Sequence, residues 1–415
     1  MDDGSFRDIT VEVNGRRYRA PRQPTVVVCV DGSEPDYTTE AIKAGRMPYL
    51  AGALARGASL LADCVVPSFT NPNNLSIVTG APPSVHGISG NYFLDPDTGK
   101  EVMMNDPRFL RTGTILSAFA RAGVPVAVVT AKDKLRSLLG HEMPGICFSA
   151  EKADQATIAE NGIDDVLAFV GRPLPSVYSA DLSEFVFAAG VRLLETRRPQ
   201  FMYLSTTDYI QHKHAPGTPV ANDFYAMIDR HLAAMDRLGA VIALTADHGM
   251  NGKHGADGQP QVIYLQDALD RLVGTDAARV ILPITDPYVV HHGALGSFAT
   301  AYLPAGADRA AVLKAIAAIP GMERALDGDA AAAEFGLPRD RIGDIVAVSA
   351  RHWVIGTSAA RHDLSGLDAP LRSHGGISEQ RVPLMVTRPV KPLPHARLRN
   401  FDILDVALNH LAEAS

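Results

Sequence analysis

The 415-residue sequence has few cysteines, few aromatic side chains and no long hydrophobic run. The three cysteines are odd in number, widely spaced and set in apolar segments, so a disulfide scaffold is excluded and reduced thiols in the cytoplasm are expected. No apolar run approaches the roughly 20 residues that span a bilayer. The start of the chain is polar and acidic, unlike a secretory leader, and we therefore expect a soluble protein without a membrane partner.

The sequence also lacks an excess of positive charge. Its formal net charge is −7, with acidic and basic residues mixed along the chain, which argues against a nucleic-acid partner. An anionic substrate would need local positive charge in its site.

The length exceeds that of a usual single core, so a large and a smaller domain are expected. The oligomeric state stays open, with a homodimer among the alternatives.

What the sequence does contain is a repeated alternation of β-branched strands and amphipathic helices. Strands covered on both faces are predicted for 25-TVVVCV-30, 124-VPVAVVT-130, 201-FMYLST-206 and 240-AVIALT-245. This alternation predicts an α/β fold with a doubly wound, mostly parallel sheet. Ligands bind at the carboxyl ends of the strands in such sheets, and a charged residue follows each of these strands.

The pattern changes to short strands and an alanine-rich helix between residues 257 and 371. We interpret this segment as a small α+β cap inserted into a catalytic core formed by residues 1–256 and 372–415. Near the start, the alternating stretch around Asn14 and Gly15 predicts a two-residue hairpin at the edge of the core.

Acids and histidines after the predicted strands favour a metal site. Asp208 and His212 are four residues apart, so a helix starting at Asp208 would bring both side chains to one face. Other candidate ligands follow strand ends or stand beside glycines: Asp31, Asp247, His248 and His374. Oxygen and imidazole ligands without a thiolate suit a catalytic zinc, with manganese or another divalent ion as the alternative. Taken alone, an acid at a strand end is more often a turn or helix-cap residue than a metal ligand; the case rests on six such residues at one edge.

Thr70 is the candidate nucleophile. It directly precedes 71-NPNNLSIVT-79, which predicts a helix with Pro72 in its first turn. The free N–H groups at the start of a helix favour a bound phosphoryl group. The alternative is that Thr70 or Asn71 only caps the helix.

Six stretches together, in this order, resemble the alkaline phosphatase superfamily, particularly its phosphodiesterase/nucleotide pyrophosphatase branch. They are 28-VCVDG-32, 69-FTNPNNLSIVTG-80, 86-HGISGN-91, 208-DYIQH-212, 246-ADHGM-250 and 373-SHGG-376. The resemblance implies one zinc ion held by Asp208, His212 and His374. It implies a second zinc ion held by Asp31, Asp247 and His248, with Thr70 as nucleophile and ligand and Asn91 as donor to a phosphoryl oxygen.

Lys132 and Lys134 alternate beyond a predicted strand end, so both could point to one side and present ammonium groups to a compact anion. The alternative is a solvated pair. The arrangement resembles the phosphonoacetate hydrolases of this superfamily, in which such a pair contacts the phosphonate and the carboxylate of the substrate. The resemblance implies cleavage of the carbon–phosphorus bond of a small phosphonate, phosphonoacetate, to acetate and phosphate through a phospho-threonine.

Other functions remain open at this point. One is a phosphodiesterase or nucleotide pyrophosphatase on the same metal core, although an aromatic content of 6% offers little for stacking a base. Others are a sulfatase and a metal-stabilised binding protein without catalysis. Among the remaining side chains, His254 is a candidate substrate contact, and His86, His214 and Trp353 are expected to be structural or peripheral. His291, His292, His352 and His362 stay unassigned.

Overall fold

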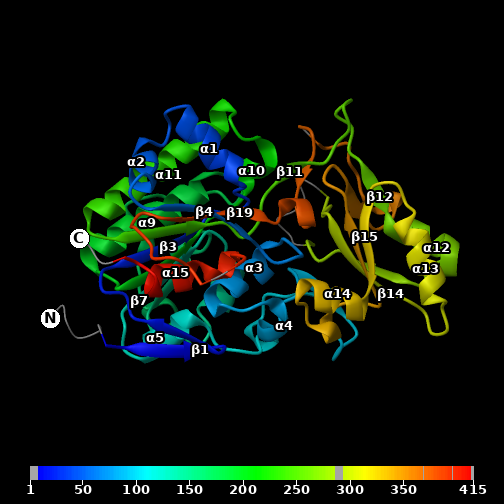
Figure 1. Ribbon diagram of the computed structural model, residues 1–415, viewed down its shortest axis with the longest axis horizontal. Coiled ribbons are helices and arrows are strands. Elements are labelled where there is room, and N and C mark those ends of the chain that lie inside the picture. Colours follow the sequence, from blue (N-terminus) through cyan, green and yellow to red (C-terminus); the bar gives the residue numbers. More distant parts are fainter. Residues whose placement is uncertain (1–7, 286–292, 368, 395, 413–415) are drawn as a thin grey trace.

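The computed structural model describes residues 8–285, 293–367, 369–394 and 396–412. Its centre is a seven-stranded sheet with the order β4-β19-β10-β3-β9-β7-β8, and a smaller sheet lies beside it (Figure 1). The strands of the large sheet are β3 (Thr25–Cys29), β4 (Ala58–Asp63), β7 (Val126–Thr130), β8 (Ile146–Ser149), β9 (Phe201–Ser205), β10 (Val241–Thr245) and β19 (Arg381–Val386). Only the two pairings of β19 are antiparallel among the described strands of this sheet. The predicted doubly wound, mostly parallel sheet is confirmed.

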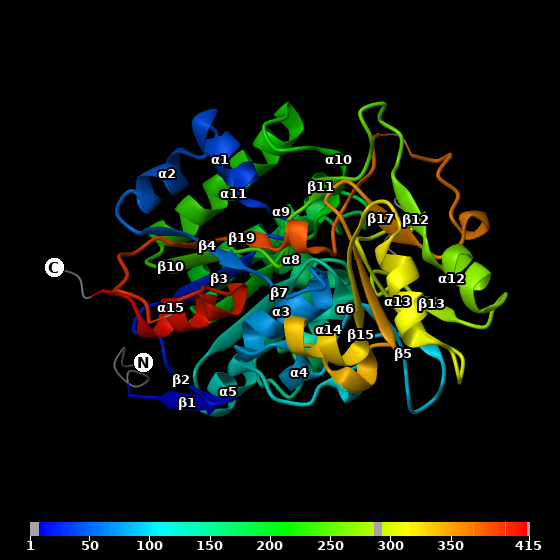
Figure 2. The same ribbon diagram turned by 45° about the vertical axis from the view of Figure 1, so that its right-hand side comes forward.

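Helices cover both faces of this sheet (Figure 2). One face carries α1 (Pro35–Lys43), α2 (Pro48–Leu54), α9 (Asp181–Thr196) and α11 (Pro219–Arg237), and the other carries α3 (Thr70–Thr79), α5 (Ile115–Arg121) and α15 (Ile403–Asn409). Successive residues of a strand enter opposite layers, so Val26 joins one apolar cluster and Val27 the other. Because both faces are covered, β3, β7, β9 and β10 are buried along their whole length, which explains their uninterrupted apolar sequences.

The hairpin near the start of the chain is formed by β1 (Thr10–Val13) and β2 (Arg16–Arg19). Asn14 and Gly15 both have positive φ, 52° and 75°, as the predicted two-residue turn requires. Tyr18 is fully buried and packs into the cluster that contains α5 and α15. Val13 is buried in the same cluster, so the hairpin is held on the core by the apolar side chains of both strands.

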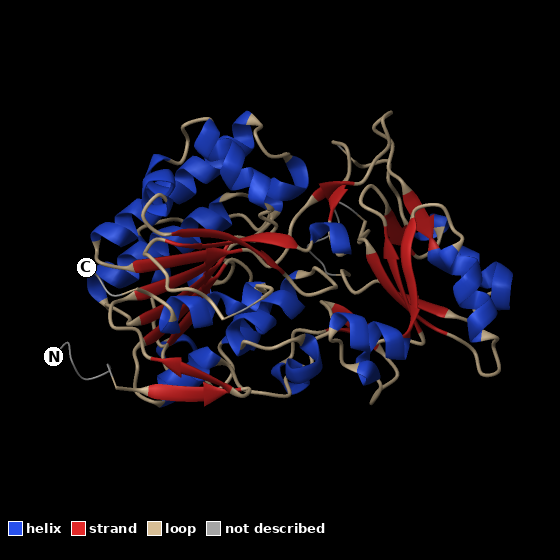
Figure 3. Cartoon of the chain, in the orientation of Figure 1, coloured by secondary structure: helices blue, strands red, loops and turns tan. Residues whose placement is uncertain are grey.

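A second sheet is antiparallel and has the order β13-β14-β16-β15 (Figure 3). Its strands are β13 (Arg279–Ile281), β14 (Phe298–Tyr302), β15 (Met322–Asp327) and β16 (Ile345–Ser349), and α12 (Leu265–Val273), α13 (Arg309–Ala317) and α14 (Gly328–Phe335) belong to the same segment. These elements share a separate apolar cluster, against which Trp353 packs as predicted. The division into core and inserted cap stays a prediction.

Short elements complete the chain. They are α4 (Pro83–His86), β5 (Tyr92–Leu94), β6 (Glu101–Met103), α6 (Asp133–Leu139), α7 (Ile158–Asn161), α8 (Val166–Val170), α10 (Tyr209–Lys213), β11 (Asn251–Gly252), β12 (Val262–Tyr264), β17 (Val354–Gly356) and β18 (Arg372–Ser373). β11 pairs with β18, so the chain enters and leaves the 257–371 segment at neighbouring positions. Across the described residues, no helix has the length and apolar character needed to cross a bilayer. The three cysteines are buried free thiols.

Candidate metal centre

The site lies where four neighbouring strands of the large sheet end. The strands β10, β3, β9 and β7 are adjacent and parallel. Asp247, Asp31, Asp208 and Lys132 follow their carboxyl ends, so the sheet order brings these residues to one edge. A cavity at this edge is lined by eight of the predicted site residues: Asp31, Thr70, Asn91, Lys132, Lys134, Asp208, His212 and His374. Asp247 and His248 lie behind them, fully buried.

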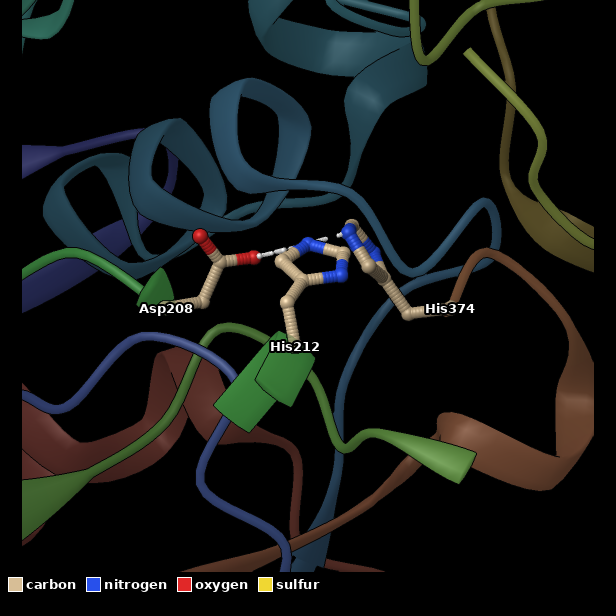
Figure 4. Close-up of side chains that lie close together, drawn as sticks. All are labelled: Asp208, His212 and His374. Atoms are coloured by element: carbon tan, nitrogen blue, oxygen red, sulfur yellow. Dashed lines mark ion pairs between the residues drawn. The ribbon is translucent and has the colours of Figure 1, made fainter. Parts of the chain in front are cut away.

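The first group of possible metal ligands consists of Asp208, His212 and His374. Asp208 is the N-cap of α10 and His212 lies on the next turn, so both project to the same side as predicted. Figure 4 shows the three side chains pointing toward one another. Asp208 Oδ2 lies 2.9 Å from His212 Nε2 and 3.7 Å from His374 Nε2.

The second group consists of Asp31, Asp247 and His248. His248 Nε2 lies 3.2 Å from Asp31 Oδ1 and 3.9 Å from Asp247 Oδ2. In each group, one possible ligand atom per residue lies within 4.8 Å of the others. The structure therefore contains two clusters that could each hold a metal ion, with the membership that the family resemblance implied.

The three imidazoles are held in the orientation that a metal ligand needs. Nδ1 of His212, His248 and His374 lies 2.9, 2.9 and 2.8 Å from the carbonyl oxygens of Arg372, Gly249 and Ser68, respectively. A neutral imidazole that donates from Nδ1 leaves the lone pair of Nε2 facing the cluster. The backbone thus selects the tautomer that can bind a cation through Nε2.

The chemistry of the second group fits a cation better than a closed hydrogen-bond network. Among the described residues, Asp31 Oδ1 and His248 Nε2 are buried atoms without a hydrogen-bond partner, although they lie 3.2 Å apart. A buried polar atom without a partner costs about 1–3 kcal/mol. A divalent ion with oxygen and nitrogen ligands would satisfy both atoms.

The carboxylates concentrate negative charge in this buried place. Burial, together with Asp208 and Asp247, raises the pKa of the Asp31 carboxyl well above its usual range. Burial also acts to raise the pKa of Asp208, but the neighbouring histidines, His212 foremost, hold it well below its usual value. Burial lowers the pKa of His248, yet Asp247 and Asp31 outweigh that effect and raise it to about 10. The clusters therefore attract positive charge strongly.

Thr70 is the first residue of α3 and the only residue of that helix that is not buried. Its position on the cavity wall agrees with the predicted nucleophile. Phe69 occupies the N-cap position, and its own side chain makes no capping hydrogen bond. The alternative that Thr70 or Asn71 serves as the cap is therefore wrong.

Asn91 lies next to the start of the same helix. Its Oδ1 accepts a hydrogen bond of 3.0 Å from the backbone N–H of Asn71, and its own N–H donates to Pro283 O at 2.8 Å. With Oδ1 engaged in this way, Nδ2 is the end of the amide that can donate elsewhere. The predicted role as donor to a phosphoryl oxygen stays a prediction.

Lys132 and Lys134 both line the cavity, but not for the reason that the sequence suggested. We expected extended backbone with alternating side chains; instead α6 begins at Asp133, so Lys132 is its N-cap and Lys134 lies in its first turn. Burial lowers the pKa of Lys132. Burial, reinforced by the charge of Lys132, lowers the pKa of Lys134 to about 7.

Among the described residues, the other histidines singled out in the sequence are not members of the two clusters. His254 Nδ1 lies 2.9 Å from Gly255 O, and His254 is not among the described residues lining the cavity, so its predicted substrate contact is not supported. His86 is buried 2.9 Å from Ser76 Oγ, and burial lowers its pKa to about 3, in keeping with a structural role. The backbone oxygen of His214 accepts from Tyr37, the ring of His352 lies near Gly252 O, and the ring of His362 lies near Thr357. His291 and His292 lie outside the described residues.

Sequence reasoning missed several residues around the site. Tyr178 and Ile284 line the cavity from distant segments. Asn74 was quoted in a motif but given no role, although it contacts Asp247. Thr206 Oγ1 accepts the backbone N–H of Asp31 at 2.9 Å. Only Asn74 carried a signal, because it is the third asparagine of a predicted helix, and a buried amide needs hydrogen-bond partners.

Comparison with known proteins places this geometry in a family. Residues 25–376 match the family model described as type I phosphodiesterase / nucleotide pyrophosphatase. The chain belongs to this family. Its fold is the one expected for the alkaline phosphatase superfamily.

Two solved structures of a phosphonoacetate hydrolase from Sinorhizobium meliloti 1021, one in complex with phosphonoacetate and one with phosphonoformate, are similar over almost the whole chain. Each is 61% identical, covers 97% of this chain and 99% of its own, and has a TM-score of 0.94. Human ectonucleotide pyrophosphatase / phosphodiesterase 5 is 18% identical over 92% of this chain and 95% of its own, with a TM-score of 0.62, and shares the fold.

Matches to curated relatives are shorter. A phosphonoacetate hydrolase of Penicillium oxalicum is 56% identical over 41 residues, which are 9% of this chain and 57% of that protein. An uncharacterized pyrophosphatase/phosphodiesterase of Schizosaccharomyces pombe is 32% identical over 123 residues, 29% of this chain and 23% of that protein. The chain thus spans less than two thirds of the length of either curated relative that it matches.

Proposed function

We propose that this protein hydrolyses the carbon–phosphorus bond of phosphonoacetate to give acetate and phosphate. The supporting observation is the 61% identity, over 97% of the chain, to a phosphonoacetate hydrolase whose structure holds phosphonoacetate. The cavity adds chemical support, because it combines a hydroxyl on a helix N-terminus, two lysines and two clusters of metal-binding side chains.

The proposed cofactors are two divalent cations, zinc by preference and manganese as the alternative. One would be held by Asp208, His212 and His374, and the other by Asp31, Asp247 and His248, with Thr70 Oγ1 as a further ligand. When bound, such ions supply positive charge that makes the threonine hydroxyl a better nucleophile and stabilises charge on the phosphoryl group.

The chain's own residues would act in two steps. Thr70 Oγ1 attacks phosphorus, and the carbon–phosphorus bond breaks with its electron pair passing into the adjacent carboxylate as an enediolate. This carbanion equivalent takes up a proton to give acetate, which balances the proton lost from the Thr70 hydroxyl, while the phosphoryl group stays on Thr70. A water molecule then attacks phosphorus, releasing phosphate and restoring the threonine hydroxyl.

Three groups would assist this course. Lys132 and Lys134 would place ammonium groups where negative charge develops on the carboxylate of the leaving group. Asn91 would donate to a phosphoryl oxygen beside the start of α3, where its Oδ1 already holds the backbone N–H of Asn71. A carbon leaving group without such charge stabilisation would be poor, so the lysines are the residues that would favour phosphonoacetate over an ordinary ester.

The arrangement of the chain and its compartment are proposals as well. The pairing of β11 with β18 and the separate apolar cluster of the second sheet support residues 257–371 as a cap on a core of 1–256 and 372–415. The three buried free thiols support a reducing compartment such as the cytoplasm. The proposed partner is a small phosphonate and not a nucleic acid, with a homodimer as an open alternative.

A substrate panel with the purified protein tests the function. Phosphonoacetate, phosphonopyruvate, 2-aminoethylphosphonate and bis(4-nitrophenyl) phosphate would be offered to zinc-loaded and manganese-loaded protein, with metal content measured in parallel. We expect phosphate release from phosphonoacetate to exceed that from the other two phosphonates. Faster cleavage of the diester than of phosphonoacetate would instead support the phosphodiesterase alternative.

A further inference from the structure

Asn74 connects three segments that carry the site: its own helix α3, strand β9 and the residues that follow β10. It sits on α3 one turn after Thr70, is fully buried, and makes hydrogen bonds at both ends of its amide. Its Nδ2 donates to Thr70 O and to Asp247 Oδ2, both at 3.1 Å. Its Oδ1 accepts from Tyr203 at 2.8 Å and from Ser205 Oγ at 3.1 Å.

The direction of this amide is fixed by the chemistry of its partners. A carboxylate and a backbone carbonyl can only accept, so the end that faces Asp247 and Thr70 must be the NH2 group. The hydroxyls of Tyr203 and Ser205 then donate to the oxygen. All four contacts are satisfied together in one orientation.

The bond to Asp247 completes the support of that carboxylate. Asp247 Oδ1 accepts the backbone N–H groups of Gly32 and His248, at 3.2 and 3.0 Å. Oδ2 accepts from Asn74 and is also the oxygen 3.9 Å from His248 Nε2. Because an oxygen of a carboxylate has two lone pairs, Oδ2 keeps one for a metal ion while Asn74 occupies the other.

We infer that Asn74 is a positioning residue that orients Asp247 for metal binding and ties its oxygen to the turn that presents Thr70. The inference rests on the proposed metal centre, and not on the identity of the substrate. Partners that orient metal ligands in this way typically contribute about 10–100-fold to metal affinity.

The substitution Asn74→Asp tests this role, with Asn73→Asp as the matched control. Asn74→Asp keeps the size of the side chain but replaces the donor that faces Asp247 by an oxygen. Asn73 is the neighbouring residue, is equally buried, and donates to backbone oxygens of Val65, Pro67 and Phe69. Both variants lose buried hydrogen bonds of α3, but only Asn74→Asp alters the contact with Asp247.

The readout is metal affinity, measured by competition with a chelator and by metal content after dialysis. We expect Asn74→Asp to weaken one of the two bound ions by about 10–100-fold, while Asn73→Asp retains both ions. Equal affinities in the two variants would overturn the inference. Two retained metals without hydrolysis of phosphonoacetate in the unchanged protein would refute the proposed substrate and leave this comparison intact.

A pair of exchanged residues tests the direct contact without metal. In the double variant Asn74→Asp, Asp247→Asn, the amide at position 247 can still accept from Gly32 and His248 and can donate to the carboxylate at position 74. We expect the metal-free double variant to have a higher melting temperature than metal-free Asn74→Asp. If Asn74→Asp does not fold, the readout is whether the double variant folds. A folded double variant supports the contact between positions 74 and 247, and an unfolded one overturns it.

Discussion

The imidazole rings of His248 and His374 stack with their centroids 3.7 Å apart and their planes within 6° of parallel, although each belongs to a different metal-binding cluster. The two clusters are therefore adjacent, with the stacked rings of His248 and His374 in contact between them. Burial and the adjacent His248 lower the pKa of His374 well below its usual range, which disfavours a positive charge on both stacked rings at once. An ion in either cluster would face the same cavity, as an in-line displacement between two cations requires.

Thr70→Ala is expected to abolish turnover without loss of metal. The hydroxyl that would attack phosphorus is gone, while the six acids and histidines of the clusters remain. Loss of a nucleophile lowers kcat by about 10⁴-fold or more. Phosphate release and metal content, measured on the same sample, check this, and Thr70→Ser provides a control that keeps a hydroxyl. Full activity of the alanine variant would show that another group is the nucleophile.

Lys132→Ala and Lys134→Ala are expected to discriminate between substrates. Each removes an ammonium group proposed to contact the carboxylate of phosphonoacetate, which corresponds to a loss of about 10–100-fold in kcat/KM. Hydrolysis of an aryl phosphate ester, whose leaving group has no carboxylate, should fall less. Lys152→Ala is the control, because Lys152 is a half-exposed lysine paired with Asp133. Equal losses on both substrates would remove the reason for assigning the carbon–phosphorus bond.

The pKa of Lys134 predicts that substrate binding weakens as pH rises. Its value of about 7 in the free protein means that Lys134 loses its proton as the pH passes through 7. An anionic substrate binds the protonated form, so KM for phosphonoacetate should rise above about pH 7, by up to tenfold per pH unit. Binding near pH 8 should take up a proton, which calorimetry in buffers of different ionisation enthalpy measures. Lys134→Met should abolish both effects; an unchanged pH profile in that variant would assign them to another group.

The residues of the site that could be predicted from the sequence are those located just after the ends of predicted strands. Asp31, Asp208 and Asp247 come directly after buried strands, and adjacent parallel strands bring their carboxyl ends to one edge. His374 and Asn91 lie in loops, and only the order of the family's motifs placed them. The lysine pair was placed correctly by an incorrect argument, because Asp133 starts a helix where we expected extended chain.

Other features depend on contacts that no local pattern contains. Ile284 reaches the cavity from the segment of the second sheet. Asn74 acquires its partners from strands far along the chain, with 129 to 173 residues between them. Lys253 and Glu379 form a buried pair across 126 residues. Hydrophobic periodicity identifies which positions are buried, but it does not specify which polar groups meet there.

Lys253→Ala is expected to destabilise the protein strongly, although it lies outside the two metal clusters. Lys253 Nζ lies 2.8 Å from Glu379 Oε1 and donates to Arg351 O at 2.8 Å, and both charged side chains are fully buried. Glu379 also accepts from Asn251 and Ser378. Removal of one partner leaves the other charge buried and uncompensated, which costs about 3–5 kcal/mol. Denaturant unfolding of the metal-loaded protein measures this change.

A double substitution distinguishes the net contribution of the ion pair to stability from the destabilisation caused by removing one partner only. Lys253→Met with Glu379→Leu removes both charges, so we expect it to be less destabilising than either single substitution. The exposed pair Arg192 and Glu195, 3.3 Å apart, is the matched control, and Arg192→Ala should change the free energy of unfolding by less than about 1 kcal/mol. A Lys253→Ala variant as stable as Arg192→Ala would contradict the account. It would mean that the protein relaxes around Glu379 and gives it water or a new partner, because a carboxylate held in an apolar interior cannot remain both charged and unpaired.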